Sequence, residues 1–304
     1  MKIQRRKFLA QSALGLGGAL LGPSLLGRAE TTPKSFDPFA RVPLGKTKLN
    51  FSRVVLGTGM RGGNRESNQT RLGKDKFEAL IRDSFDRGVK AFDLADLYGT
   101  HPYVIPALKG IARDRFQVIT KIWWNKGGIP EPERPDADVC VEPVLLLSEL
   151  KTDYLDLVLL HCVTSAKWPE ELRRQMDILS KLKDQGKIRA LGVSCHSLDA
   201  LAAAAVEPWV ESVHTRINPY GMSMDGPPEK VVPVLKKIHA AGKGVVGMKI
   251  MGEGRLRNDD EKRDASVKFA LELGCVDVLN VGCESIAEVD DLAARVRKVE
   301  QKPG

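Results

Sequence analysis

The sequence predicts an α/β fold, namely a (β/α)8 TIM barrel preceded by a short hairpin. Short runs of β-branched residues alternate with longer amphipathic segments from residue 51 onward, which is typical of repeated strand-helix units around a parallel sheet. We count eight such units, and eight units in about 250 residues suit a closed barrel. An open sheet would leave two strand edges to protect, so the closed form is favoured.

Each predicted strand is a short apolar run, and an amphipathic segment follows it. The predicted strands are Arg53–Thr58, Val89–Asp93, Phe116–Lys121, Tyr154–His161, Arg189–Ser194, Ser212–Asn218, Gly244–Lys249 and Val276–Val281. The predicted helices are Asp75–Arg87, Tyr103–Ala112, Val139–Lys151, Pro169–Gln185, Leu198–Ala205, Glu229–Ala241, Asp260–Leu273 and Ser285–Val299. Glycines follow four helices, where a left-handed residue commonly ends a helix, at Gly88, Gly186, Gly242 and Gly274.

Several segments complete the expected organisation. Residues 41–300 form the barrel domain, and residues 30–40 form a linker before it. The segment Val42–Leu49 predicts a small hairpin that plugs the barrel bottom. Two connections are unusually long, Gly59–Lys74 after the first strand and Trp123–Asp138 after the third. We expect both at the catalytic mouth, as lids or substrate walls.

Residues 1–29 differ in composition from the rest of the chain. The sequence Arg5-Arg6-Lys7-Phe8-Leu9 opens a stretch rich in glycine, alanine and leucine, and Gly27-Arg28-Ala29 ends it with small residues at the positions that determine cleavage. We interpret the segment as a twin-arginine export signal. This predicts a periplasmic or otherwise exported protein, with the twin-arginine machinery as a partner and no membrane association after processing.

Composition and charge disfavour several classes of protein. The formal net charge of +8 falls to +3 without residues 1–29, which carry five basic residues and no acid. The remaining cations are interspersed with acids, which is typical of solvated surface and not of a nucleic-acid-binding stripe. No Cys-x-x-Cys pair or metal-ligand spacing occurs, so we expect no metal site. The chain has five cysteines, and an odd number disfavours a complete disulfide framework. The cysteines are Cys140, Cys162, Cys195, Cys275 and Cys283.

Four polar residues lie at the ends of three consecutive predicted strands. Asp93 and Tyr98 follow the second strand, Lys121 closes the third, and His161 closes the fourth. The carboxyl ends of barrel strands meet at one mouth, where such folds carry their active sites. Each residue alone also has a structural explanation, but their order favours one catalytic group.

These four side chains suit reduction of a carbonyl. The reaction needs a proton donor, and a tyrosine with a pKa of ~10 is a reluctant one at neutral pH. We therefore expect the Lys121 ammonium to lower the pKa of Tyr98, and Asp93 to hold the lysine in place. His161 would orient the carbonyl oxygen. An alternative use of Lys121, as a Schiff-base amine in a lyase or isomerase, is disfavoured by the nearby Asp93 and Tyr98.

The chain resembles the aldo-keto reductase family from Arg41 to about Val299. The resemblance rests on Pro43–Thr47 leading into Val55–Gly59, on Phe92–Ala95 through Tyr98-Gly99, on Lys121, on Tyr154–Leu157 through His161, and on Gly186–Arg189 through Gly192–Ser194. It implies a (β/α)8 barrel that uses NADP(H) or NAD(H) to interconvert carbonyls and alcohols. It also implies Tyr98 as the proton donor, Lys121 and Asp93 as its electrostatic support, and His161 as the residue that orients the carbonyl.

The resemblance also implies contacts to the nicotinamide, and several positions depart from the family pattern. Ser194 matches the serine that holds the nicotinamide amide, whereas Cys195 replaces an asparagine and is a weaker hydrogen-bonding group. His214 stands in place of a glutamine. Met248 replaces the aromatic residue that stacks on the ring, and a thioether still packs against it.

The adenosine end departs furthest from the family. Gly282 and Ser285 retain a backbone cradle after the eighth strand, but Glu288 replaces an arginine and Leu292 an asparagine. A carboxylate near a 2′-phosphate would repel it, so NADH competes with NADPH as the expected cofactor. The glycine-rich loop after the seventh strand offers the opposing phosphate contacts, with candidates Lys249, Gly252, Arg255 and Arg257.

The stretch Gly57-Thr58-Gly59-Met60-Arg61-Gly62 matches the dinucleotide fingerprint of a Rossmann domain. The fingerprint requires a helix to open at its last glycine, and here a polar loop continues instead. We therefore interpret these glycines as positions of close backbone approach at the barrel mouth, with Gly57 and Thr58 beside the cofactor.

Trp123 and Trp124 follow Lys121 closely and are candidate walls of a substrate pocket, with anchoring of a rim loop as the alternative. The predicted function is hydride transfer between a nicotinamide cofactor and an aldehyde, a ketone or a sugar-derived carbonyl. The altered cofactor positions leave one alternative open, a catalytically silent nucleotide-binding barrel that acts as a sensor or partner module.

Overall fold

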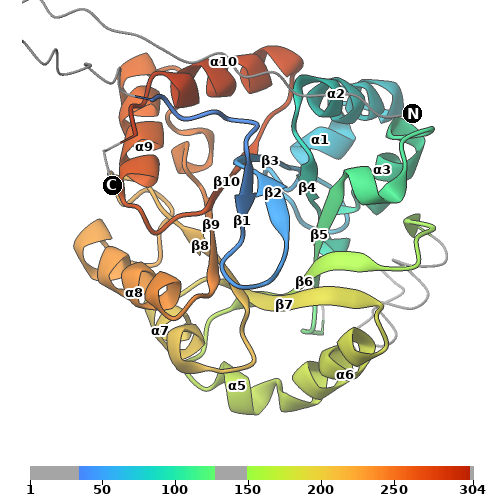
Figure 1. The fold of residues 1–304 in the computed structure, drawn as a ribbon, viewed down its shortest axis with the longest axis vertical. Coiled ribbons are helices and arrows are strands. Elements are labelled where there is room, and N and C mark those ends of the chain that lie inside the picture. The colour runs from blue at the N-terminus through green and yellow to red at the C-terminus, as the bar shows by residue number, and fades with distance from the viewer. Residues whose placement is uncertain (1–33, 127–148, 302–304) are drawn as a thin grey trace, which may run out of the picture. The chain divides into compact units, whose positions relative to one another are not determined.

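The computed structural model describes residues 34–126 and 149–301, and within these ranges eight parallel strands close into a barrel. The strands follow one another around the barrel in the order β10-β3-β4-β5-β6-β7-β8-β9 (Figure 1). Their bounds are β3 (Val54–Gly57), β4 (Ala91–Asp93), β5 (Gln117–Ile122), β6 (Leu155–Val163), β7 (Ile188–Cys195), β8 (Ser212–Arg216), β9 (Gly244–Met248) and β10 (Val278–Gly282). Each overlaps one predicted strand, and the predicted (β/α)8 barrel is confirmed.

The described helices lie outside the strands and cover the barrel wall (Figure 1). Their bounds are α1 (Asn68–Arg71), α2 (Lys74–Arg87), α3 (His101–Ala107), α5 (Trp168–Glu171), α6 (Arg173–Asp184), α7 (Leu198–Val206), α8 (Pro228–Ala240), α9 (Asp260–Glu272) and α10 (Ile286–Arg297). Most of the helix predicted at Val139–Lys151 and most of the long loop predicted at Trp123–Asp138 lie outside the described residues, as do residues 1–29 and Cys140. Among the helices of the described ranges, none combines the length and apolarity needed to cross a membrane.

Two predicted helices differ from the observed ones. The segment predicted as one helix at Pro169–Gln185 forms α5 and α6, because Leu172 leaves helical geometry with φ −107° and ψ 17°. The helix predicted at Tyr103–Ala112 ends earlier, at Ala107 in α3. Pro106 lies in its last turn, and Gly110 follows with a φ of 84°. The short helix α1, inside the long loop after β3, was not predicted. Its capping box, closed by the side chains of Ser67 and Thr70, is the sequence signal that could have found it.

The glycines predicted to end helices adopt the left-handed conformation, and this prediction is confirmed. The φ angles are 119° at Gly88, 78° at Gly186, 81° at Gly242 and 66° at Gly274. These turns reverse the chain from each helix toward the next strand, so they help to set the strand-helix repeat.

The predicted hairpin is present as β1 (Arg41–Pro43) paired antiparallel with β2 (Asn50–Ser52). It lies across one end of the barrel (Figure 1). Leu44 and Phe51 are fully buried and join one hydrophobic cluster with side chains of the barrel interior. That cluster includes Val55, Ala91, Ile119, Leu157, Leu159, Ala190, Val246 and Val278. The plug therefore seals the bottom with apolar contacts and leaves polar chemistry to the opposite mouth.

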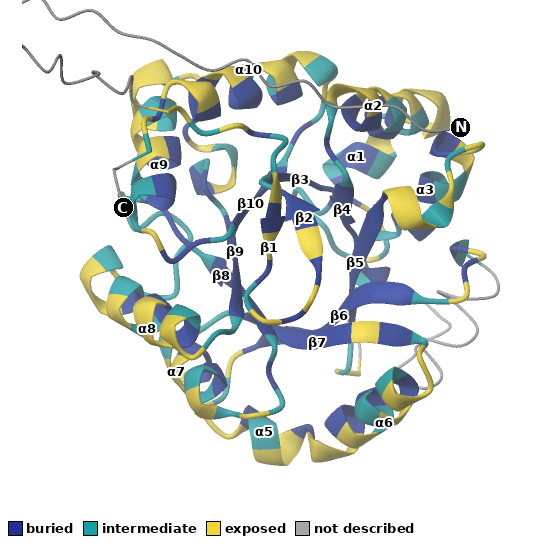
Figure 2. Ribbon diagram, viewed as in Figure 1, coloured by how far each residue is buried: buried dark blue, intermediate teal, exposed yellow. Residues whose placement is uncertain are grey.

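Burial follows the layers of the barrel. The strands are almost entirely buried, whereas the helices bury one face and expose the other (Figure 2). A larger hydrophobic cluster fills the space between strands and helices, and Phe77, Phe92 and Trp168 are among its buried aromatic members. This double core holds the strand ends rigidly, which the site at the mouth requires.

One ion cluster around a buried carboxylate ties the fourth strand of the barrel to its neighbours. The Asp156 carboxylate on β6 accepts hydrogen bonds from Arg113 at 2.8 Å, from the Val118 backbone N–H of β5 at 2.9 Å, and from Arg189 of β7 at 3.2 Å. Because Asp156 is fully buried, these donors satisfy a charge that would otherwise be costly. The cluster holds β5 and β6 in register, and these strands carry Lys121 and His161.

Candidate active site

A cavity of about 320 Å³ opens among the carboxyl ends of the strands. Strand pairing sets Gly282, Gly57 and Asp93 side by side at the ends of β10, β3 and β4. These three residues and Tyr98 all line the cavity. Among the described residues, no cluster of side chains is arranged to hold a metal ion.

Asp93 and Lys121 form a buried ion pair below the cavity. Lys121 is 1% exposed and Asp93 is 2% exposed, and the lysine also donates to the Leu94 carbonyl at 2.9 Å. Burial alone would raise the pKa of Asp93, but the nearby Lys121 ammonium and His214 outweigh it and lower that pKa to about 2. The carboxylate therefore remains ionised and fixes the lysine in place, as predicted for this pair.

Tyr98 and His161 meet above this ion pair. The Tyr98 hydroxyl lies 3.1 Å from His161 Nε2, and the two rings pack edge to face with centroids 5.3 Å apart. The Lys121 ammonium lies 4.9 Å from the centroid of the Tyr98 ring. The structure thus brings the four residues together beside a cavity, with Asp93, Lys121 and His161 buried and Tyr98 half-buried.

The predicted direction of the Tyr98 pKa shift was wrong. We expected Lys121 to lower this pKa, but burial raises it well above its usual value, and the Asp93 and Cys162 side chains raise it further. The physical reason is that burial disfavours the charged phenolate, and the Asp93 carboxylate that pairs with Lys121 offsets part of the ammonium charge. Tyr98 therefore keeps its proton at neutral pH, which a proton donor requires.

His161 lies where β6 departs from regular pairing. The register of β6 against β7 shifts between Leu160 and Val163, and Cys162 adopts a positive φ of 57°. The indole N–H of Trp124 donates to the His161 carbonyl at 2.7 Å. This bulge and its indole anchor set the direction of the imidazole, because an added residue turns a strand locally.

The two tryptophans predicted as substrate walls have different positions. Trp123 packs edge to face against His161, with ring centroids 5.9 Å apart. Trp124 is anchored to the His161 backbone and packs on the hydrophobic core. Neither lines the 320 Å³ cavity, so a role in substrate binding stays a prediction.

The glycine-rich loop after β3 supports the ring of Tyr98 directly. A Cβ atom on Gly59 would lie 2.3 Å from the Tyr98 ring, and one on Gly62 would lie 2.5 Å from it. The loop is itself tied to the turn that carries Tyr98, since Arg65 pairs with Asp96 at 3.0 Å. The backbone of this loop therefore lies close against the Tyr98 ring, in line with the close approach expected at these glycines.

Asn280 is a site residue that the sequence interpretation missed. Its amide donates to the Asp93 carboxylate, and its side chain lines the cavity. His214 Nε2 approaches the same carboxylate at 3.4 Å. Asn280 interrupts the apolar run of the eighth strand near its end, so the rule that identified Lys121 and His161 could also have found it.

A family model described as the aldo/keto reductase family matches residues 53–299. The chain belongs to this family. YhdN, an aldo-keto reductase of Bacillus subtilis, is 31% identical over 206 residues, which cover 64% of this chain and 57% of that protein. The NADH-specific methylglyoxal reductase of Escherichia coli is 27% identical over 172 residues, covering 51% of each protein. The chain thus spans little more than half the length of these curated relatives.

Solved structures support the fold of this aldo/keto reductase family member. An aldo-keto reductase from Bacillus halodurans in its holo form superimposes with a TM-score of 0.66 at 21% identity, covering 89% of this chain and 93% of that one. An aldo/keto reductase from Klebsiella pneumoniae in complex with NADP and acetate gives a TM-score of 0.62 at 21% identity, covering 86% of this chain and 91% of that one.

The predicted cofactor residues of this family member fall into two groups. Those that line the cavity are Gly57, Thr58, Met248, Lys249 and Gly282. Those that do not are Ser194, Cys195, His214, Gly252, Arg255 and Ser285. Cys195 is fully buried in β7, and Ser285 caps α10. Contacts to a cofactor stay predictions for both groups.

Three buried polar atoms on β7, β8 and β10 have no partner among the described residues. The Ser194 hydroxyl, His214 Nδ1 and Asn280 Oδ1 are buried and have no hydrogen-bond partner in the described protein. Ser194 and His214 are paired across β7 and β8. Buried polar atoms without partners are costly, so a bound group that supplies donors and acceptors here would be stabilised.

Buried histidines predict acid sensitivity of folding. Burial lowers the pKa values of His161 and His214, and it lowers that of His196 to about 4. The unfolded chain has histidine pKa values of ~6.5, so it binds more protons than the folded chain below that pH, and acid favours unfolding. We expect stability to fall as pH drops from ~6.5 toward 4, with His196 alone contributing on the order of 3 kcal/mol.

Urea unfolding at neutral pH and at about pH 5 measures this effect. The His196→Gln variant should lose part of the pH dependence. The His239→Gln variant is the matched control, because His239 is 41% exposed on α8 and pairs with Asp277. Equal unfolding free energies at the two pH values in the unaltered protein would contradict the prediction.

Proposed function

We propose that this protein is an NAD(P)H-dependent reductase that transfers a hydride between a nicotinamide cofactor and a carbonyl or alcohol substrate. The observation that carries the proposal is the Tyr98 hydroxyl, held 3.1 Å from His161 beside the Lys121–Asp93 pair and facing the cavity. The family supports it, and relatives named as methylglyoxal reductases suggest small aldehydes as the first substrates to test.

The residues of the chain would divide the chemistry as follows. The cofactor, when bound, supplies the hydride. Tyr98 donates its phenolic proton to the carbonyl oxygen as negative charge develops there, since its pKa is too high for it to be ionised beforehand. The Lys121 ammonium, 4.9 Å from the centroid of the phenol ring, stabilises the phenolate that remains. In the reverse direction that phenolate accepts the proton of an alcohol.

His161 would act as a neutral hydrogen-bonding group. Burial, followed by the nearby Lys121 charge, lowers the pKa of His161 well below its usual value. A neutral imidazole can orient the Tyr98 hydroxyl and the substrate oxygen without adding a second buried cation beside Lys121. A neutral histidine therefore suits this position, where the Lys121 ammonium would repel a second positive charge.

Loss of reduced-cofactor absorbance with a panel of small aldehydes, ketones and sugar-derived carbonyls tests the proposal. Substrate-dependent turnover would support it. Tight cofactor binding with no turnover across the panel would favour the silent nucleotide-binding barrel instead.

Crowding around Tyr98 gives a further prediction. Gly59→Ala places a methyl group 2.3 Å from the phenol ring, so the ring must shift. A displacement of about 1 Å at the reacting group lowers rates by up to ~100-fold, and we expect a loss of kcat of roughly that size. Gly63→Ala is the control in the same loop, because an added Cβ there meets nothing within 4 Å. Equal kcat values for the two variants would contradict the prediction.

We also propose that residues 1–29 direct export by the twin-arginine pathway. The Arg5-Arg6 pair, the apolar stretch after it and the small residues at Gly27 and Ala29 support this. The pathway carries folded proteins, so the enzyme would reach its destination with cofactor already bound. Protease added to spheroplasts of the native host should digest the protein, and protection of the full-length chain would contradict export.

A further inference from the structure

The cavity extends from Tyr98, after β4, to the first turns of α10, after β10. In the proposed reaction the hydride must arrive beside Tyr98, so the nicotinamide lies at that end. The rest of the dinucleotide then extends toward α10. The adenosine end therefore meets a set of lining residues that the catalytic chemistry does not use: Arg257, Arg263, Glu284, Glu288, Asp291 and Leu292.

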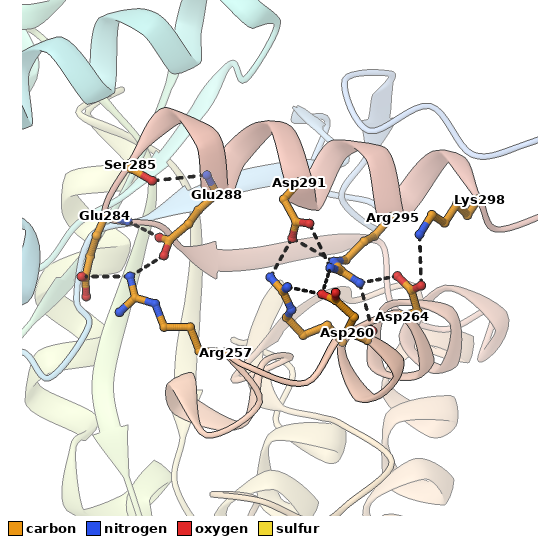
Figure 3. Close-up of polar contacts among 10 residues, drawn as sticks. Arg257, Asp260, Asp264, Glu284, Ser285, Glu288, Asp291, Arg295 and Lys298 are labelled. Carbon is orange, nitrogen blue, oxygen red and sulfur yellow. Dashed lines mark hydrogen bonds and ion pairs between the residues drawn. The ribbon is translucent and has the colours of Figure 1, made fainter.

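Two arginines that line this end are already paired with carboxylates. Figure 3 labels one of them, Arg257, beside Glu284 and Glu288. Arg257 pairs with Glu284 at 3.2 Å and also with Glu288. Arg263 pairs with Asp291 at 2.9 Å and also with Asp260. A 2′-phosphate, which carries nearly two negative charges, would have to displace carboxylates from both arginines. Their positive charge is committed to the protein.

The N-terminus of α10 also has a carboxylate beside it. This 12-residue helix is capped by Ser285, whose hydroxyl accepts from the Glu288 N–H at 3.4 Å. The Glu288 carboxylate in turn accepts from the Glu284 N–H at 2.7 Å. A helix N-terminus attracts anions through its free N–H groups, and here the Glu288 carboxylate already lies in the first turn and bonds to the N–H that precedes the cap residue. A second anion at the same place would meet like charge.

Glu288 keeps the capacity to bind a neutral sugar. Each carboxylate oxygen has two lone pairs, and only Arg257 and the Glu284 N–H use them in the described structure. Ribose hydroxyls are donors, and acidic side chains bind them at adenosine sites that select NAD over NADP. The end of the cavity is therefore built for hydroxyl groups and against phosphate.

We propose that this end of the cavity binds an unphosphorylated adenosine ribose, with Glu288 accepting from its hydroxyls, so that the protein selects NADH over NADPH. The inference rests on the proposed function for the orientation of the dinucleotide. It does not rest on turnover, because selection acts on binding. Arg61 also lines the cavity, is exposed, and is the cation that would reverse the preference if it reached a 2′-phosphate.

Direct binding of NADH and NADPH to the intact protein, by calorimetry without substrate, tests the inference. We expect NADH to bind at least about tenfold more tightly, which is the effect of one repulsive contact of ~1.4 kcal/mol. Adenosine 5′-monophosphate and adenosine 2′,5′-bisphosphate, which lack the nicotinamide and differ only in the 2′-phosphate, should show the same order. Tighter or equal binding of NADPH would overturn the inference and leave the proposed function intact. Failure of both dinucleotides to bind would overturn the proposed function as well.

The Glu288→Gln variant separates charge from folding. Glutamine can still accept from the Glu284 N–H, so α10 should keep its cap while the repulsion disappears. We expect the ratio of NADPH to NADH dissociation constants to fall about tenfold. Asp290→Asn is the matched control, because it removes one negative charge from the same helix. Asp290 lies outside the cavity and pairs with Arg87 at 2.6 Å, so its substitution should leave the ratio unchanged. An unchanged ratio in Glu288→Gln, with an unchanged melting temperature, would overturn the role of Glu288.

Discussion

Replacing Tyr98 with phenylalanine is expected to lower kcat by about 100- to 10,000-fold, the range associated with loss of a general acid. The substitution removes the hydroxyl that bonds to His161 and keeps the ring packed against Gly59 and Gly62. Cofactor affinity should change little, because the ring still lines the cavity. Steady-state kinetics with the best aldehyde of the panel, together with calorimetric cofactor binding, measure the two effects separately.

Tyr103→Phe is the matched control for this variant. Tyr103 lies in α3 and packs its ring against Phe77, with centroids 4.9 Å apart, away from the cavity. It should keep wild-type kcat. If Tyr98→Phe retained more than about a tenth of wild-type kcat, Tyr98 would not be the proton donor and a solvent molecule or His161 would have to serve.

Replacing Lys121 with methionine is expected to damage both folding and catalysis. The substitution leaves the Asp93 carboxylate buried without its cation, and loss of one partner of a buried pair costs about 3–5 kcal/mol. Turnover should also fall sharply, because the phenolate of Tyr98 loses its stabilising charge. Urea unfolding and kcat report the two consequences.

The double variant Lys121→Met/Asp93→Asn distinguishes the two roles. Removing both charges takes away the uncompensated carboxylate, so much of the lost stability should return while turnover stays low. Recovery of turnover together with stability would show that Lys121 acts only in folding. Wild-type stability of the single variant would contradict the assignment of a buried ion pair.

The site shows which kinds of residue can be predicted from sequence. Asp93, Lys121 and His161 end apolar runs that read as strands, and polar residues at strand ends of a barrel must face the mouth or be buried without partners. Asn280 obeys the same rule and was missed because it lies in β10, far in sequence from the other three. Its role depends on closure of the barrel, which pairs β10 with β3.

Tyr98 marks a limit of the same reasoning. The position of its ring beside Lys121 followed from the strand pattern, but the direction of its pKa shift did not. That direction depends on how deeply the phenol is buried and on how much of the lysine charge is offset by a carboxylate. Both are consequences of packing among strands β4, β5 and β6, and no local pattern reports them.

Local pattern alone determined the order of strands and helices, the left-handed glycines at helix ends and the identity of the four catalytic candidates. These follow from periodicity, from backbone sterics and from the chemistry of single residues, which act over a few positions of the chain. Tertiary structure alone decided the bulge that aims His161, the contact of Gly59 with the phenol and the pairing of Arg257 with Glu284 and Glu288. Those features depend on distances between residues up to about 40 positions apart in the chain, and only closure and packing of the barrel set such distances.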